Sequence, residues 1–304
     1  MTSPNWFIDL RAQSHGGPVG TLKITDGNGQ LFDTATLVEK VRGQDVLLMT
    51  HGFENNRQQG TDALNEWKSH LQIDPPPFFI GVLWPGDGFL PIFIDYIWEG
   101  SEAEKSGTVL GQFVDANFGA AASVSFGSHS LGVRVMMQAI SQLNNIQKAR
   151  HLITLAAAIE DDTLNKEFQG VAGKVKHISV IYSMQDHVLA RAYPAGNLVG
   201  GVIERGNPNV KAALGRSGPA SPAPASVIGN PRLPDTWSYG HTDYTSTDHV
   251  DGDFPPTVNI PSPDTPAWGL TAPAPIPNPP ALTATDKWKP CWSADYISTR
   301  WPLS

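Results

Sequence analysis

The chain of 304 residues has little charge, a single cysteine and no long hydrophobic run. Charged residues make up only 16% of it and the net charge is -8, whereas nucleic-acid-binding surfaces are basic, so we expect no nucleic-acid partner. One cysteine, Cys291, cannot form an internal disulfide and leaves the redox compartment open. Because no run is long and apolar enough to span a bilayer, we do not expect an integral membrane protein.

Two further absences concern targeting and metals. Residues 1–6 lack the basic and then apolar pattern of a secretory signal peptide. We expect a soluble protein, either cytoplasmic or secreted with its signal removed, and the sequence does not choose between them. No HExxH or paired-cysteine spacing indicates a metal, and no cofactor is expected.

Strand-like and helix-like segments alternate along the first two thirds of the chain. Expected strands cover residues 5–12, 19–25, 45–50, 78–84, 121–126, 152–158 and 177–183, and expected helices cover 34–41, 58–71, 101–117 and 131–140. The central strands are continuously apolar, which is typical of a parallel sheet with helices on both faces. The sequence therefore predicts one α/β domain over residues 1–304, with its core at about 5–250.

Two segments depart from this alternation. Residues 85–100 combine aromatic and aliphatic side chains with glycine and proline, so we expect either a lid or pocket-lining segment over the site, or a loop with buried anchors. Residues 215–304 are rich in proline and glycine and are expected to wrap the surface or to remain mobile.

The most informative motif is Ser128-His129-Ser130-Leu131-Gly132, between an apolar strand and an apolar helix. A small-x-Ser-x-Gly sequence in that place predicts a nucleophile elbow, a sharp turn that exposes the serine hydroxyl at the end of the sheet. Ser128 stands where such elbows usually have glycine. The context predicts Ser130 as a catalytic nucleophile.

A serine hydroxyl needs a base and a group that orients the base. In serine enzymes with this elbow, the acid and then the histidine follow the serine along the chain. Asp186 lies a few residues after an expected strand and is the candidate acid, with Asp161 and Asp162 as alternatives. His241, in a late glycine-containing loop, is the candidate base, with His249 as its rival.

Backbone amides and aromatic side chains complete the predicted site. The turn after the first buried strand, His51-Gly52-Phe53, would bring the Phe53 N–H to the oxyanion, with the Leu131 N–H as second donor. We interpret His51 as a structural hydrogen-bonding residue. The expected substrate-binding side chains lie beside the serine or in aromatic segments: His129, Trp84, Phe89 and Trp98.

These motifs resemble a bacterial branch of the α/β-hydrolase superfamily whose members are hydrolases of unknown function. The matching residues are 51–56, 83–85, 128–132, 155–162, 181–189 and 240–241, within a similarity that covers roughly residues 46–244. The resemblance implies an α/β-hydrolase fold and the triad named above. It departs from the branch at Ser128 and at Ala157-Ala158, where the branch often has Ala-Pro.

The expected activity is hydrolysis of carboxylic esters through an acyl-enzyme, on a small-molecule, lipid or polymeric substrate. An amidase, peptidase or thioesterase would use the same triad, so these alternatives stay open. A non-catalytic binding protein on the same fold is the remaining alternative, and the oligomeric state is open.

Overall fold

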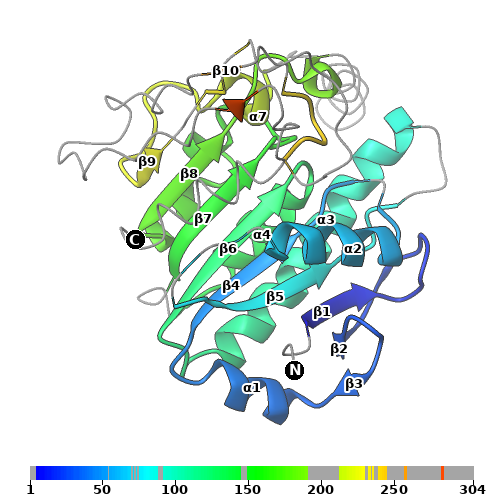
Figure 1. Cartoon of the computed structure of the whole chain (residues 1–304). Helices are drawn as coiled ribbons and strands as arrows, with labels where there is room; N and C mark the ends of the chain where they lie inside the picture. The colour runs from blue at the N-terminus through cyan, green and yellow to red at the C-terminus, as the bar shows by residue number, and fades with distance from the viewer. Residues whose placement is uncertain are drawn as a thin grey trace.

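The computed structural model describes residues 5–53, 55–69, 71, 73, 75–87, 92–144, 149–190, 212–229, 232–233, 235, 239–244, 257–258 and 282–283. Its centre is a nine-stranded sheet with the order β3-β2-β1-β5-β4-β6-β7-β8-β9 (Figure 1). The strands of this sheet are β1 Trp6–Arg11, β2 Val19–Asp26, β3 Leu31–Phe32, β4 Asp45–Thr50, β5 Phe78–Leu83, β6 Ser123–His129, β7 Ala149–Leu155, β8 His177–Ile181 and β9 Val227–Gly229. A separate pair joins β10 Thr257–Val258 to β11 Leu282–Thr283.

The sheet is parallel from β1 to β9, and only the edge strands β2 and β3 run antiparallel to their neighbours. The strands β4, β6 and β7 are buried along almost their whole length. Strands covered on both faces need apolar side chains on both, which explains their continuous hydrophobic runs. All the parallel strands end at one edge of the sheet, where ligands bind in open α/β folds.

Helices cover both faces of the sheet (Figure 1). They are α1 Thr34–Val41, α2 Arg57–Ser69, α3 Ile92–Asn117, α4 Gly132–Ser141, α5 Gln169–Lys174 and the short α7 Leu214–Ser217, with a 3-10 turn at Thr163–Asn165. Alternate residues of each strand point to opposite faces. Val46 and Leu48 of β4 therefore join the larger core with α1, α3, α4 and α5, whereas Leu47 and Met49 pack in a second core with α2 and residues 239–244.

The predicted fold class, a mostly parallel sheet with helices on both faces, is confirmed. Several element boundaries differ from the prediction by two or more residues, including both ends of β6 and of β7. Helix α3 begins at Ile92 rather than at residue 101, so part of the segment expected to be a lid, a pocket lining or a loop is helical. Residues 92–99 contain neither proline nor glycine, so nothing in their sequence interrupts a helix there. Strand β7 ends at Leu155 rather than at residue 158, because Ala156 has a positive φ of 46°.

Within the described part of the chain, no helix combines the length and apolar character needed to cross a membrane. Most of residues 215–304, expected to wrap the surface, lie outside the described residues, as do Phe89 and His249.

Candidate active site

The turn between β6 and α4 holds Ser130 in a strained conformation. Its φ is 53°, in the left-handed region that side chains other than glycine rarely adopt. The surrounding structure fixes this backbone on both sides: the Ser130 N–H donates to the Leu155 carbonyl at 2.9 Å, and the Ala158 N–H donates to the Ser130 carbonyl at 3.2 Å. Strain held in this way occurs at functional sites and brings the hydroxyl to the edge of the sheet.

Small residues allow the elbow to pack against the turn after β4. A Cβ on Gly132 would clash with the His51 carbonyl, and one on Gly52 would lie 2.9 Å from the Cβ of Ser130. Ser128 fits at the first position because its buried hydroxyl donates to the Ile153 carbonyl at 3.2 Å. The departure from glycine is therefore accommodated by a hydrogen bond.

The structure brings Ser130, His241 and Asp186 into one hydrogen-bonded chain. The Ser130 hydroxyl lies 2.7 Å from His241 Nε2, and His241 Nδ1 lies 2.7 Å from Asp186 Oδ2. Asp186 is fully buried after β8, and its other oxygen accepts from the Leu189 N–H at 2.8 Å. With the imidazole proton on Nδ1, His241 donates to the carboxylate and accepts from the hydroxyl. Such a chain can deprotonate an attacking serine and stabilise the resulting cation.

Long-range hydrogen bonds hold the loop of residues 239–244 over the elbow. The buried Ser183 hydroxyl donates to the Tyr239 carbonyl at 2.7 Å, and His129 Nε2 donates to the His241 carbonyl at 2.7 Å. The Asp243 carboxylate accepts from the Gly240 N–H. The loop is therefore positioned by its own turn and by residues far away in the sequence.

His129, a predicted substrate-binding residue, is buried beneath this loop. Its ring centroid lies 5.1 Å from that of His241, and its Nε2 is already engaged by the His241 carbonyl. Burial, followed by the charge of His241, lowers the pKa of His129 to about 3. At neutral pH His129 is a neutral donor that supports the loop.

The alternative acids lie elsewhere. Asp162 pairs with Lys166 at 2.5 Å, and the main chain of Asp161 bonds to residues 212 and 220. Of the three predicted carboxylates, the structure places Asp186 next to His241.

The predicted oxyanion donors also meet at the elbow. Leu131 follows Ser130 directly, and the turn that carries Phe53 packs on Ser130 through Gly52. Within the described part of the chain, neither the Phe53 N–H nor the Leu131 N–H makes a hydrogen bond. Both amides therefore have no competing acceptor among the described residues, and their role as oxyanion donors stays a prediction.

Trp84 corrects one prediction. Its side chain is fully buried, its Nε1 donates to the His51 carbonyl at 3.0 Å, and its ring stacks at 6.0 Å from the His51 ring. A fully buried ring presents no surface to a ligand, so Trp84 supports the turn after β4 instead of lining a pocket. Trp98 lies within α3, but its side chain is outside the described residues.

Arg11 was not predicted from the sequence, and its buried guanidinium connects the loops that follow β4 and β5 at the same edge of the sheet. It donates to the carbonyls of Asn55 at 3.0 Å and Trp84 at 2.7 Å, and it pairs with the buried Asp87. The signal was an arginine at the end of a fully buried strand, because a buried guanidinium needs acceptors. No local pattern identifies those acceptors, because they come from distant loops.

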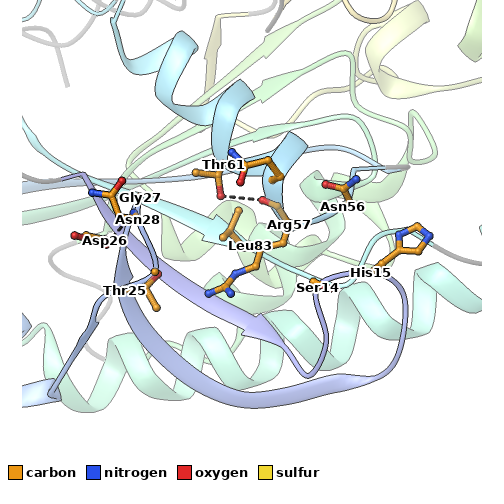
Figure 2. Close-up of a pocket in the computed structure, with 12 residues that line it drawn as sticks. Ser14, His15, Thr25, Asp26, Gly27, Asn28, Asn56, Arg57, Thr61 and Leu83 are labelled. Carbon is orange, nitrogen blue, oxygen red and sulfur yellow. Dashed lines mark hydrogen bonds between the residues drawn. The ribbon is translucent and has the colours of Figure 1, made fainter.

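A separate pocket of about 370 Å³ lies beside the start of α2, between the end of β2 and the loop that follows β1 (Figure 2). Most of its lining residues have polar side chains, among them Arg57, which pairs with the buried Asp9 at 2.7 Å. None of the residues of the serine–histidine–aspartate chain lines it. In the described residues, no group of three or more histidines, cysteines or carboxylates is arranged to hold a metal ion.

Comparison with known proteins agrees with the geometry at the level of the family. No curated protein matches the chain. The model of a family described as "alpha/beta hydrolase of unknown function (DUF900)" matches residues 32–248, which cover more than half of the chain and include the elbow, Asp186 and His241. The chain therefore belongs to this family of α/β hydrolases of unknown function.

Proposed function

We propose that this α/β hydrolase cleaves carboxylic esters, with Ser130 as nucleophile, His241 as base and Asp186 as the residue that orients the base. The observation that carries the proposal is the continuous chain of two 2.7 Å contacts from the Ser130 hydroxyl through His241 to the buried Asp186 carboxylate. A serine in a strained turn, with a base and an orienting carboxylate in reach, meets the geometric requirements for acyl transfer.

In the proposed reaction, His241 Nε2 takes the proton of Ser130 as its oxygen attacks the ester carbonyl carbon. Asp186 stabilises the imidazolium, and the N–H groups of Phe53 and Leu131 hold the oxyanion. The imidazolium then gives its proton to the leaving alcohol, and an acyl-enzyme remains. A water molecule deprotonated by His241 attacks this ester, releases the carboxylic acid and restores the serine.

The side chains at the elbow favour a neutral acyl group. The half-buried aromatic side chain of Phe53 lies on the turn that carries the proposed oxyanion donor. The net charge of -8 does not favour anionic substrates. Amides and thioesters pass through the same tetrahedral intermediate. Rates on an ester, a thioester and an amide with the same acyl group measure which leaving group the enzyme prefers.

The first test is labelling with a fluorophosphonate, followed by intact-mass measurement, of the wild type beside Ser130→Ala. We expect one adduct on the wild type and none on the variant, because only an activated serine reacts. Labelling of both proteins would remove Ser130 as the nucleophile. Labelling of neither, together with no turnover of p-nitrophenyl esters, would refute the proposed activity.

A further inference from the structure

The peptide between Gly52 and Phe53 decides where the Phe53 N–H points. The carbonyl oxygen of Gly52 and the N–H of Phe53 belong to the same planar trans peptide, so they point in opposite directions. Two side chains contact this carbonyl: His51 Nδ1 at 2.8 Å and Asn55 Nδ2 at 3.3 Å. Fixing the oxygen therefore also fixes the direction of the amide proton.

His51 is held in the tautomer that can donate to this carbonyl. Its Nε2 accepts from the Trp84 N–H at 3.3 Å, which leaves the ring proton on Nδ1, facing the Gly52 oxygen. Burial lowers the pKa of His51 to about 4, so the ring is neutral and keeps this single proton at neutral pH. The other charged groups that act on it, Arg11 and Asp87, have opposite effects on its charge.

Asn55 acts on the same turn from the other side. Its amide Nδ2 lies within reach of two carbonyls, that of Gly52 at 3.3 Å and that of Phe53 at 2.9 Å. Two acceptors require a donor, which identifies the contacting atom as the nitrogen. The Asn55 main chain is itself fixed, because its carbonyl accepts from the buried Arg11 and it forms a β-bridge with Gly86.

We infer that Asn55 and His51 are positioning residues that lock the Gly52–Phe53 peptide with its N–H toward the oxyanion of the reaction at Ser130. This inference rests on the proposed function and adds to it how one half of the oxyanion hole is preformed. Neither side chain touches the substrate. Asn55 works through the carbonyls it binds, and Arg11 works through Asn55.

The sharpest test is Asn55→Asp, which keeps the size of the side chain but replaces the donor with a carboxylate that repels both carbonyls. On p-nitrophenyl butyrate we expect kcat to fall about 10²- to 10³-fold, the loss produced by removing one oxyanion donor. KM should change little, because the ground-state ester makes weak use of the hole. Asn55→Ala removes the donor without adding charge and should show the same pattern with a smaller loss.

Asn56→Ala is the matched control. The Asn56 side chain accepts from the Gln59 N–H at 3.0 Å, at the start of α2, whereas the side-chain donors to the Gly52 carbonyl are His51 and Asn55. We expect it to lower the melting temperature and leave kcat near the wild-type value. An equal fall of kcat in Asn56→Ala and Asn55→Ala would show a general effect of this segment and overturn the assignment.

Crystal structures of the wild type and of Asn55→Asp, or of Asn55→Ala if the first does not fold, give a readout independent of activity. We expect the Gly52–Phe53 peptide to rotate in the variant. An unrotated peptide, or a kcat equal to that of the wild type, would overturn the positioning role. A rotated peptide in a protein whose wild type neither reacts with fluorophosphonate nor turns over esters would support the positioning role and refute the proposed catalysis.

Discussion

The two turns that meet at Ser130 are held in place in different ways. The elbow lies between β6 and α4, and the small residues around it let the chain close tightly within a few positions. The loop of residues 239–244 has two internal hydrogen bonds, both between Gly240 and Asp243. It depends otherwise on Ser183, His129 and Asp186, which lie 55 or more positions away. The first turn is a product of local sequence, and the second is a product of the finished fold.

This difference separates two kinds of fragility. The elbow stores its strain in backbone that is fixed by hydrogen bonds to Leu155 and Ala158, so it fails when its packing fails. The histidine loop is attached through individual side chains, so removing one can release His241 while the fold remains. Changes in the loop should therefore lower activity more than stability, and changes in the elbow should lower both.

The largest expected effect comes from the carboxylate that holds the base. In Asp186→Asn one amide atom must face the Leu189 N–H and the other must face His241 Nδ1, and the donor placed there conflicts with the working tautomer. We expect kcat/KM to fall about 10⁴-fold, as it does for the equivalent change in other triads. Steady-state kinetics on p-nitrophenyl esters measure it.

Asp162→Asn is the control for this change, because that carboxylate pairs with the exposed Lys166. Its kcat/KM should remain close to that of the wild type. A large loss of kcat/KM in Asp162→Asn together with a small loss in Asp186→Asn would show that Asp186 does not orient His241.

Acidic pH should lower the free energy of unfolding through the buried histidines near the elbow and the loop of residues 239–244. Burial lowers the pKa of His129 to about 3 and of His51 to about 4, from 6.5 in the unfolded chain. The unfolded chain therefore binds more protons below pH 6.5, so the free energy of unfolding falls as the pH drops from 6.5 toward 4. Between pH 7.5 and pH 5 we expect a loss of about 2 kcal/mol for each histidine.

Urea denaturation at pH 7.5 and pH 5 measures this loss. Other groups titrate in the same range, so the comparison that isolates one histidine is with His129→Gln, which has no titrating ring. Its free energy of unfolding should depend less on pH by about 2 kcal/mol. An unchanged pH dependence in the variant would mean that His129 is not held neutral by burial.

The same contrast explains what the sequence could predict. The buried strands, the helices and the elbow follow from local periodicity and from small residues at fixed offsets. Chain order singled out Asp186 and His241, which the structure brings to Ser130. Trp84 was predicted to line a pocket, because the sequence does not show whether an aromatic side chain at the end of a strand is buried. The fold buries it against His51.

The remaining parts of the site depend on contacts between distant loops. The acceptors of Arg11, from residues 55, 84 and 87, and the bond from His129 to the loop of His241 join segments about 40 to 110 positions apart. No periodicity or motif in one sequence encodes such pairings. The role of the Asn55 amide could not be predicted either, because it depends on the orientation of the Gly52–Phe53 peptide.

Adding a methyl group to the elbow tests whether its close local packing is needed for both stability and activity. In Gly132→Ala the new Cβ would clash with the His51 carbonyl and lie 2.8 Å from Thr50 Cγ2, so backbone must move. We expect a loss of about 3 kcal/mol in the free energy of unfolding together with a fall in kcat, because the oxyanion turn is pushed away from the serine. Gly173→Ala in α5 is the control: its Cβ meets nothing within 4 Å, and alanine should stabilise that helix slightly.

The smallest expected effect comes from a long-range hydrogen bond that holds the loop of residues 239–244. Ser183→Ala removes the hydroxyl that donates to the Tyr239 carbonyl and accepts from the partly buried Gln185 N–H, and we expect the loss of these two hydrogen bonds to cost about 1 kcal/mol in all. Because the Tyr239 bond anchors the loop of His241, we expect kcat to fall about tenfold while thermal unfolding shifts only slightly. In the control, Ser125→Ala, the buried β6 hydroxyl has no hydrogen-bond partner among the described residues, so its removal should leave kcat unchanged. If Ser183→Ala lost stability without losing kcat, the loop would be held by its packing alone, and the division between a locally built elbow and a tethered base would fail.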